Sequence, residues 1–128
     1  MNKKTKGTKA ERELIHFFWK NGFAAMRAAG SGSTPFPCPD IIAGNKIRTL
    51  AIECKAIKTL KKYLSKEDII QLKTFSKTFG AEPWIGIRFD KLKWFFLTPE
   101  DLTKTPSGYV VTINDAKNKG LILEELIL

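Results

Sequence analysis

The stretch PDIIAGNKIRTLAIECK, residues 39–55, contains two apolar runs on either side of a Gly44-Asn45 turn signal. Each run is short and rich in β-branched or bulky apolar side chains, a composition that is typical of β-strands. We therefore expect strands over 40–43 and 47–56. Because only the turn separates them, the two strands are expected to pair as an antiparallel hairpin.

The position of the turn predicts which residues face each other across this hairpin. Pairing about a point midway between residues 46 and 47 places Asp40 directly across from Glu53. Two neighbouring carboxylates repel each other, and a divalent cation is the usual reason for such a pair. Side chains alternate along a strand, so Lys55 shares a face with Glu53 while Cys54 points to the other side. For this strand taken alone, a simple Glu53–Lys55 ion pair is the alternative interpretation.

Glu11 offers a third carboxylate from the expected N-terminal helix. Apolar residues follow it at intervals of three, four and seven, so Glu11 extends the apolar stripe of the helix instead of opposing it. Thr8 and Glu11 also have the spacing of a capping box, in which Glu11 would only help to begin the helix. The two roles are compatible, and we expect convergence of Glu11, Asp40 and Glu53, with Lys55 beside them.

Two longer helices are expected. The first covers 9–21, after a mobile basic arm at 1–8, and the second covers 66–79. Ser65 is the expected N-cap of the second helix and Gly80 follows its last residue. The apolar face of this helix is expected to consist of Ile69, Leu72, Phe75 and Phe79.

The other segments predict a mixed α/β fold. Residues 30–39 are expected to form a loop and residues 57–64 a basic connection. Further strands are expected over 23–29, 83–89, 93–97 and 109–113, and a short helix over 121–128. This order predicts a single domain over 1–128, with a mixed sheet of about five strands flanked by helices.

Composition limits the class of protein. A chain of 128 residues with 43% hydrophobic content fits one globular domain. No apolar run approaches the roughly 18 residues of a membrane helix, and the basic start has no apolar stretch behind it. Cys38 and Cys54 form no metal-binding spacing with the one histidine, so both are expected to be reduced thiols. These features predict a cytoplasmic protein with no membrane partner and no small-molecule cofactor.

The net charge of +9 is unevenly distributed. Residues 1–62 hold 13 of the 22 Lys and Arg but 4 of the 13 acidic residues, whereas residues 63–128 are balanced. Such a field favours a polyanion, most commonly a phosphate backbone, and a basic solvated surface is the alternative. The lysines expected to contact DNA are Lys6, Lys9, Lys58, Lys61 and Lys62.

In a basic protein, a group of carboxylates with a lysine beside it is suited to a reaction on a phosphate group. Mg²⁺, or Mn²⁺ in its place, held by two or three carboxylates can bind a phosphate and lower the pKa of a bound water. A neighbouring lysine can orient that water or stabilise charge developing on the phosphate. The pattern therefore predicts metal-dependent phosphodiester hydrolysis.

Pro39-Asp40, followed after twelve residues by Glu53-Cys54-Lys55, resembles the PD-(D/E)xK nuclease motif. Further segments, at 6–13, 22–33 and 39–45, resemble the archaeal Holliday junction resolvases of the Hjc/Hje type, and the similarity extends to about residue 97. The resemblance implies a restriction-endonuclease-like fold. It also implies a dimer that makes paired nicks in four-way DNA junctions during recombination and repair.

The resemblance assigns roles residue by residue. It implies that metal is held by Glu11, Asp40 and Glu53, and that the catalytic lysine is Lys55. Basic residues needed for activity, through phosphate contacts, correspond to Arg12 and Arg27. A functional serine in the loop before the aspartate corresponds to either Ser31 or Ser33.

Two rivals to junction resolution remain. One is a nuclease of the same fold that acts on another DNA structure. The other is a non-catalytic nucleic-acid-binding module, which has no need of the three carboxylates together.

For the homodimer, the neutral second half is the expected contact surface, because two basic faces would repel each other. Within it we expect Trp94–Leu97, and the outer side of the second helix, to face the partner. Adjacent residues of a strand point to opposite sides, so Phe95 or Phe96 is left for a partner or for a covering helix.

Overall fold

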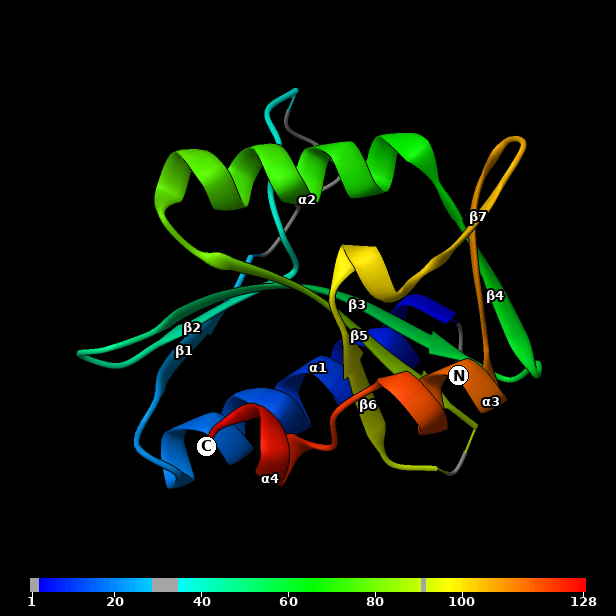
Figure 1. Cartoon of the computed structure of the whole chain (residues 1–128). Coiled ribbons are helices and arrows are strands. Elements are labelled where there is room, and N and C mark those ends of the chain that lie inside the picture. The colour runs from blue at the N-terminus through cyan, green and yellow to red at the C-terminus, as the bar shows by residue number, and fades with distance from the viewer. Residues whose placement is uncertain (1–2, 29–34, 91) are drawn as a thin grey trace.

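A central sheet of five strands lies between two helices, α1 on one face and α2 on the other (Figure 1). The computed structural model describes residues 3–28, 35–90 and 92–128, with side chains from residue 9 onward. Only β3 and β5 pair in parallel; the other neighbours in the order β1-β2-β3-β5-β6 are antiparallel. The expected mixed sheet flanked by helices is confirmed. Its strands are β1 (Ala24–Arg27), β2 (Ile41–Gly44), β3 (Thr49–Ile57), β5 (Glu82–Phe89) and β6 (Trp94–Leu97).

The β2–β3 hairpin has the register that the sequence predicts. Ile41 faces Ile52, so the next pair outward is Asp40 and Glu53. The backbone N–H of Asp40 donates to the Ile52 carbonyl at 3.0 Å, which continues the ladder to that pair. The turn is closed by Asn45, whose side-chain oxygen accepts the backbone N–H groups of residues 47 and 48. A local turn preference thus brings the two carboxylates together.

Alternation along β3 divides the core into two layers. Leu50 and Ile52 pack toward α1 (Lys3–Lys20), with Leu14 and Phe18 of that helix. Ala51 belongs to the opposite layer, under α2 (Lys66–Phe79), with Ile69, Leu72, Ile85 and Ile87. Both faces of β3 are covered, so the polar residues at its end are held by a rigid strand.

Helix α2 spans the expected residues. Its first turn is capped by the Ser65 hydroxyl, which accepts the backbone N–H of Asp68 at 3.0 Å, and Gly80 ends it with φ +85°. One expectation is wrong: Phe79 is 58% exposed, and Ser76 occupies the buried stripe instead. Residue 79 continues the spacing 69, 72, 76, but it is the last residue of the helix, where its ring stacks on Phe75 with centroids 5.1 Å apart instead of being buried in the core.

Helix α1 begins earlier than expected, at Lys3. Thr8 therefore lies inside the helix, and the expected Thr8–Glu11 capping box is wrong. Nothing in residues 3–8 forbids a helix, since lysine is a good helix former and one glycine costs only about 1 kcal/mol. The mobility of residues 1–8 stays a prediction.

The expected connection at 57–64 contains a strand. β4 (Lys61–Ser65) pairs with β8 (Gly108–Thr112), which pairs with β7 (Thr103–Thr105), in a separate three-stranded sheet. The last expected strand is thus confirmed as β8, although it lies outside the central sheet. β4 was missed because its partner lies more than forty residues away along the chain. Around this sheet lie a 3₁₀ turn, η2 (Pro99–Asp101), and the helices α3 (Ile113–Lys119) and α4 (Leu123–Leu126).

Of the two alternatives for the aromatic side chains of β6, contact with a partner and cover by a helix, the structure shows the second. All four residues of β6 are buried, Phe95 at 7% and Phe96 at 0% exposure. Phe95 and Leu97 pack in the layer that contains Ala116 of α3, whereas Trp94 and Phe96 pack with Leu126 of α4. The C-terminal segment therefore covers both sides of the strand. Among the described residues, no helix is both long and apolar enough to cross a bilayer.

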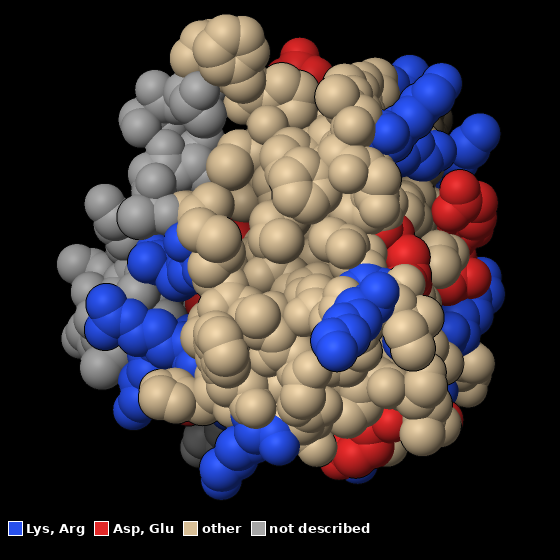
Figure 2. All heavy atoms as spheres, turned by 90° about the vertical axis from the view of Figure 1, so that its left-hand side faces the viewer, with Lys and Arg blue, Asp and Glu red and all other residues tan. Residues whose placement is uncertain are grey.

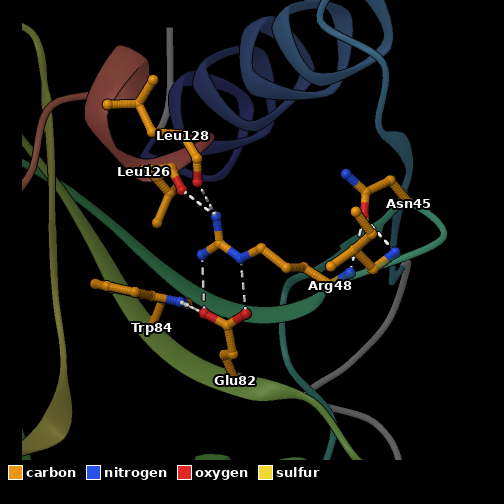
Figure 3. Close-up of polar contacts among 7 residues, drawn as sticks. Asn45, Arg48, Glu82, Trp84, Leu126 and Leu128 are labelled. Atoms are coloured by element: carbon orange, nitrogen blue, oxygen red, sulfur yellow. Dashed lines mark hydrogen bonds and ion pairs between the residues drawn. The ribbon is translucent and has the colours of Figure 1, made fainter.

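Arg48, in the β2–β3 turn, ties the C-terminal end of the chain to the sheet (Figure 3). Its Nε and Nη2 atoms donate to the two carboxylate oxygens of Glu82, each at 2.9 Å. Its Nη1 donates to the carbonyls of Leu126 and Leu128, at 2.6 and 3.3 Å. The indole N–H of Trp84 donates to the same carboxylate. This network connects α4 to β5 through one side chain.

Arg48→Met is expected to lower the free energy of unfolding by roughly 1–2 kcal/mol, since solvent screens a half-exposed pair. Hydrogen bonding to Arg48 is the main cause that lowers the pKa of Glu82. The stabilisation is therefore present above the ordinary pKa of a glutamate and is lost as the pH falls through the lowered pKa. Urea unfolding at neutral and acidic pH measures both effects. Lys46→Met, at an exposed position in the same turn, is the control, and equal stability of the two variants at neutral pH would contradict the assignment.

Candidate active site

Asp40 is held in place by backbone contacts at the start of β2. One of its carboxylate oxygens, Oδ2, accepts the backbone N–H of Cys54 at 2.7 Å. Together with its own N–H bond to Ile52, this contact ties Asp40 to β3 on both sides of Glu53. The side chain is therefore positioned before any ligand arrives.

Glu53 lies beside Asp40 with only 19% of its side chain exposed. Burial, and then the charge of Asp40, raise the pKa of Glu53 to about 8. Burial and the neighbouring negative charge therefore disfavour the ionised form of Glu53 when no cation is bound. A cation at this position would relieve the repulsion and favour the ionised form, so two hard oxygen donors fit a divalent metal here.

Glu11 reaches the same region from α1, but its carboxylate is paired with the guanidinium of Arg27. Its Oε1 accepts the Nε–H of Arg27 at 2.8 Å, with side-chain exposures of 17% and 27% for the acid and the base. Burial and the nearby charge of Asp40 raise the pKa of Glu11, and Arg27 opposes them. Within the described residues, no three acidic, histidine or cysteine side chains are close enough to share an ion. To join Asp40 and Glu53 at a metal, Glu11 must reorient.

Arg27 contacts the candidate site directly in this structure. The resemblance implied phosphate contacts for Arg27, and here its guanidinium holds Glu11. A second role toward phosphate stays a prediction. Sequence reasoning had no signal for this pair, because Arg27 of β1 and Glu11 of α1 meet only in the folded protein, where the two elements lie against each other.

Lys55 lies between two carboxylates from different elements. Its Nζ is 3.6 Å from Glu53 Oε2 and 3.6 Å from Asp68 Oδ2, and its side chain is 25% exposed. Burial alone would lower the pKa of Lys55, but the charges of Glu53, Asp68 and Asp40 outweigh it and raise the pKa. Lys55 is therefore a cation at neutral pH. Asp68 was missed by sequence reasoning, since its position in the first turn of α2 does not reveal which strand end it faces.

The other candidate residues have mixed outcomes. Cys54 points to the α1 layer, as alternation predicts, and burial raises the pKa of its thiol well above the ordinary value. Both cysteines are free thiols. Lys62 is half-buried and Lys61 lies over the Tyr63 ring at 5.4 Å. Exposed side chains belong to Lys9, Arg12, Lys58 and Lys61. Outside the described side chains lie Lys6, Ser31 and Ser33.

Comparisons with known proteins identify relatives of this chain. A family model described as archaeal Holliday junction resolvase (Hjc) matches residues 2–128. The crossover junction endodeoxyribonuclease Hjc of Archaeoglobus fulgidus is 47% identical over 108 residues, which cover 84% of this chain and 79% of the relative. Hjc of Methanocaldococcus jannaschii is 39% identical over 110 residues, covering 86% and 78%. Hje of Saccharolobus solfataricus is 36% identical over 113 residues, covering 86% and 81%.

The fold agrees as well. The 1.6 Å structure of Archaeoglobus fulgidus Hjc, a Holliday junction resolvase from an archaeal hyperthermophile, superimposes with a TM-score of 0.89 at 41% identity. The match covers 95% of this chain and 100% of that one. The expected restriction-endonuclease-like fold is confirmed. By sequence and by fold, the chain belongs to the archaeal Holliday junction resolvase family, Hjc.

Proposed function

We propose that this protein is a Mg²⁺-dependent endonuclease that resolves four-way DNA junctions as a homodimer. The observation that carries the proposal is the partly buried pair of Asp40 and Glu53, with the Lys55 ammonium 3.6 Å from Glu53. The curated relatives named above are crossover junction endodeoxyribonucleases, which supports the same substrate. Two reduced cysteines and a DNA substrate are consistent with action in the cytoplasm.

The chemistry follows from which groups converge. Asp40 and Glu53 would hold Mg²⁺, or Mn²⁺ in its place, and Glu11 would join them on leaving Arg27. The bound ion supplies an activated water and offsets negative charge on the scissile phosphate. Lys55 orients the attacking water or stabilises charge that develops on the phosphate. Exposed basic residues of α1 and of the β3–β4 connection would hold the flanking DNA backbone.

Paired incision requires two copies of the site. The described part of the chain carries one Asp40-Glu53-Lys55 set, and symmetric cuts in two strands call for a two-fold dimer. Because β6 is buried, the outer side of α2 is the contact candidate that remains from the sequence. The face that contains the C-terminal end of α2 and the β2–β3 turn is largely uncharged (Figure 2). Exposed apolar side chains on these elements and on neighbouring segments are Trp19, Met26, Ile47, Ile70 and Phe79.

Cleavage assays on matched substrates test the proposal. Labelled four-way junction, linear duplex, flap and single-stranded DNA are incubated with the protein, each with Mg²⁺ and with EDTA. We expect paired nicks in the junction with Mg²⁺ and none with EDTA. Without the ion, no metal lowers the pKa of the attacking water, so the water is not activated. Equal cleavage of duplex or flap would favour a nuclease with another substrate. Binding of the junction without cleavage in Mg²⁺ or Mn²⁺ would favour a non-catalytic module.

A further inference from the structure

The contacts of Lys55 raise the question of what keeps it in place once a cation is bound. Without an ion, Nζ lies between Glu53 Oε2 and Asp68 Oδ2, at 3.6 Å from each. A cation held by Asp40 and Glu53 would take the place of Lys55 as the partner of the Glu53 carboxylate, and its positive charge would repel the Lys55 ammonium. Of these two anionic contacts, Asp68 is the one on a different element, α2, outside the Asp40–Glu53 pair.

Asp68 is itself held firmly. Its backbone N–H donates to the Ser65 hydroxyl at 3.0 Å, and the neighbouring Ile69 is buried in the core with Leu72. The position of its carboxylate is therefore set by the capped first turn of α2 and by the packing of that helix against the sheet.

The carboxylate of Asp68 departs from a pattern seen at three other helix starts, those of η2, α3 and α4. In η2 and α3, Asp101 and Asp115 stand three residues after the N-cap and accept its backbone N–H. In α4, Glu125 does the same for Ile122. Asp68 has the equivalent place in α2, yet the ion pair that the structure shows for its carboxylate runs to Lys55. Helix α2 therefore lacks the second capping hydrogen bond, and the carboxylate of Asp68 faces the candidate site instead.

We propose that Asp68 is a positioning residue that keeps the Lys55 ammonium beside the scissile phosphate while a divalent cation occupies Asp40 and Glu53. The inference rests on the proposed function and deepens it. Asp68 touches neither metal nor DNA in this scheme and acts only through Lys55. Removing its charge should leave DNA binding intact and slow the chemical step.

Asp68→Asn is expected to lower the single-turnover cleavage rate on the order of ten- to a hundredfold, since small displacements of a catalytic group cost that much. The junction dissociation constant and the unfolding midpoint should stay unchanged, because Asn keeps the backbone contact to Ser65. Asp68→Glu should restore much of the rate. Glu67→Gln removes one charge from the same exposed turn and should cleave like wild type.

A double-mutant cycle separates this role from a general structural one. In a Lys55→Ala background, Asp68→Asn should cause no further loss of rate, because the group that it positions is gone. An equal loss in both backgrounds would overturn the proposal, as would wild-type cleavage by Asp68→Asn. If the wild type cleaves junctions and either result is found, the inference fails while the proposed function stands.

A measurement without cleavage tests the same contact. The order of the Lys55 Cε group is followed by ¹³C relaxation, with its signal assigned through Lys55→Arg, before and after addition of Mg²⁺. Wild type and Glu67→Gln should stay ordered with Mg²⁺, and Asp68→Asn should lose that order. Persistent order in Asp68→Asn would refute the proposal whatever the activity of the protein.

Discussion

Asp40→Asn is expected to lower junction cleavage about a thousandfold or more, and to leave junction affinity within roughly tenfold. The substitution keeps the shape of the side chain and an oxygen that can accept the Cys54 N–H, so the hairpin is preserved. It removes the charge that, with Glu53, makes the site attractive to a cation. Phosphate contacts hold DNA and are made elsewhere, which is why binding should survive.

Glu53→Gln and Lys55→Ala are expected to give losses of the same order. Single-turnover cleavage and a gel-shift titration in Ca²⁺ or EDTA measure rate and affinity separately. Glu124→Gln, at an exposed position on α4, is the matched control and should cleave like wild type. Normal cleavage by Asp40→Asn would exclude the carboxylate pair as the catalytic centre.

Mixing the inactive chain with wild type extends the experiment to the dimer. Heterodimers with one Asp40→Asn subunit should nick one strand of the junction, because each subunit supplies one complete site. A monomer that makes both cuts at micromolar concentration, as judged by light scattering, would contradict paired incision by a dimer.

Junction affinity is expected to fall steeply with salt, with a slope of about −0.9 per phosphate neutralised. Six to ten phosphate contacts would weaken binding by about 10³- to 10⁵-fold between 50 and 200 mM salt. The exposed Lys58 and Lys61, which follow β3 directly beyond Lys55, should contribute to this slope. Replacing both by Ala should reduce it by about two.

Lys117→Ala with Lys119→Ala provides the matched comparison. Both lysines are exposed on α3, in the half of the chain that has no excess charge, and their removal should leave the slope unchanged. Fluorescence anisotropy over a salt series gives the slopes directly. A flat salt response, or an equal effect of the two double variants, would argue against the assigned DNA-binding side.

Contacts between near neighbours could be predicted from the sequence alone. The register that places Asp40 across from Glu53 follows from a turn whose hydrogen bonds involve residues 45, 47 and 48 only. The bounds of α2 follow from Ser65 and Gly80, which act within one helical turn. Alternation along β3 placed Cys54 in the core and Lys55 in the site. In each case a short-range preference and the packing of the fold agree.

The tertiary structure alone decided the contacts between segments that are distant along the chain. Strand β4 exists because β8 pairs with it, and Phe95 and Phe96 are both buried because α3 and α4 cover opposite sides of β6. Arg27 meets Glu11, and Asp68 meets Lys55, only when helices and strands pack. Local propensities carry no information on such long-range contacts, since the geometry of these contacts is set by the burial of the whole apolar surface. The sequence by itself therefore determined the hairpin and its carboxylate pair, while packing decided which charges surround them.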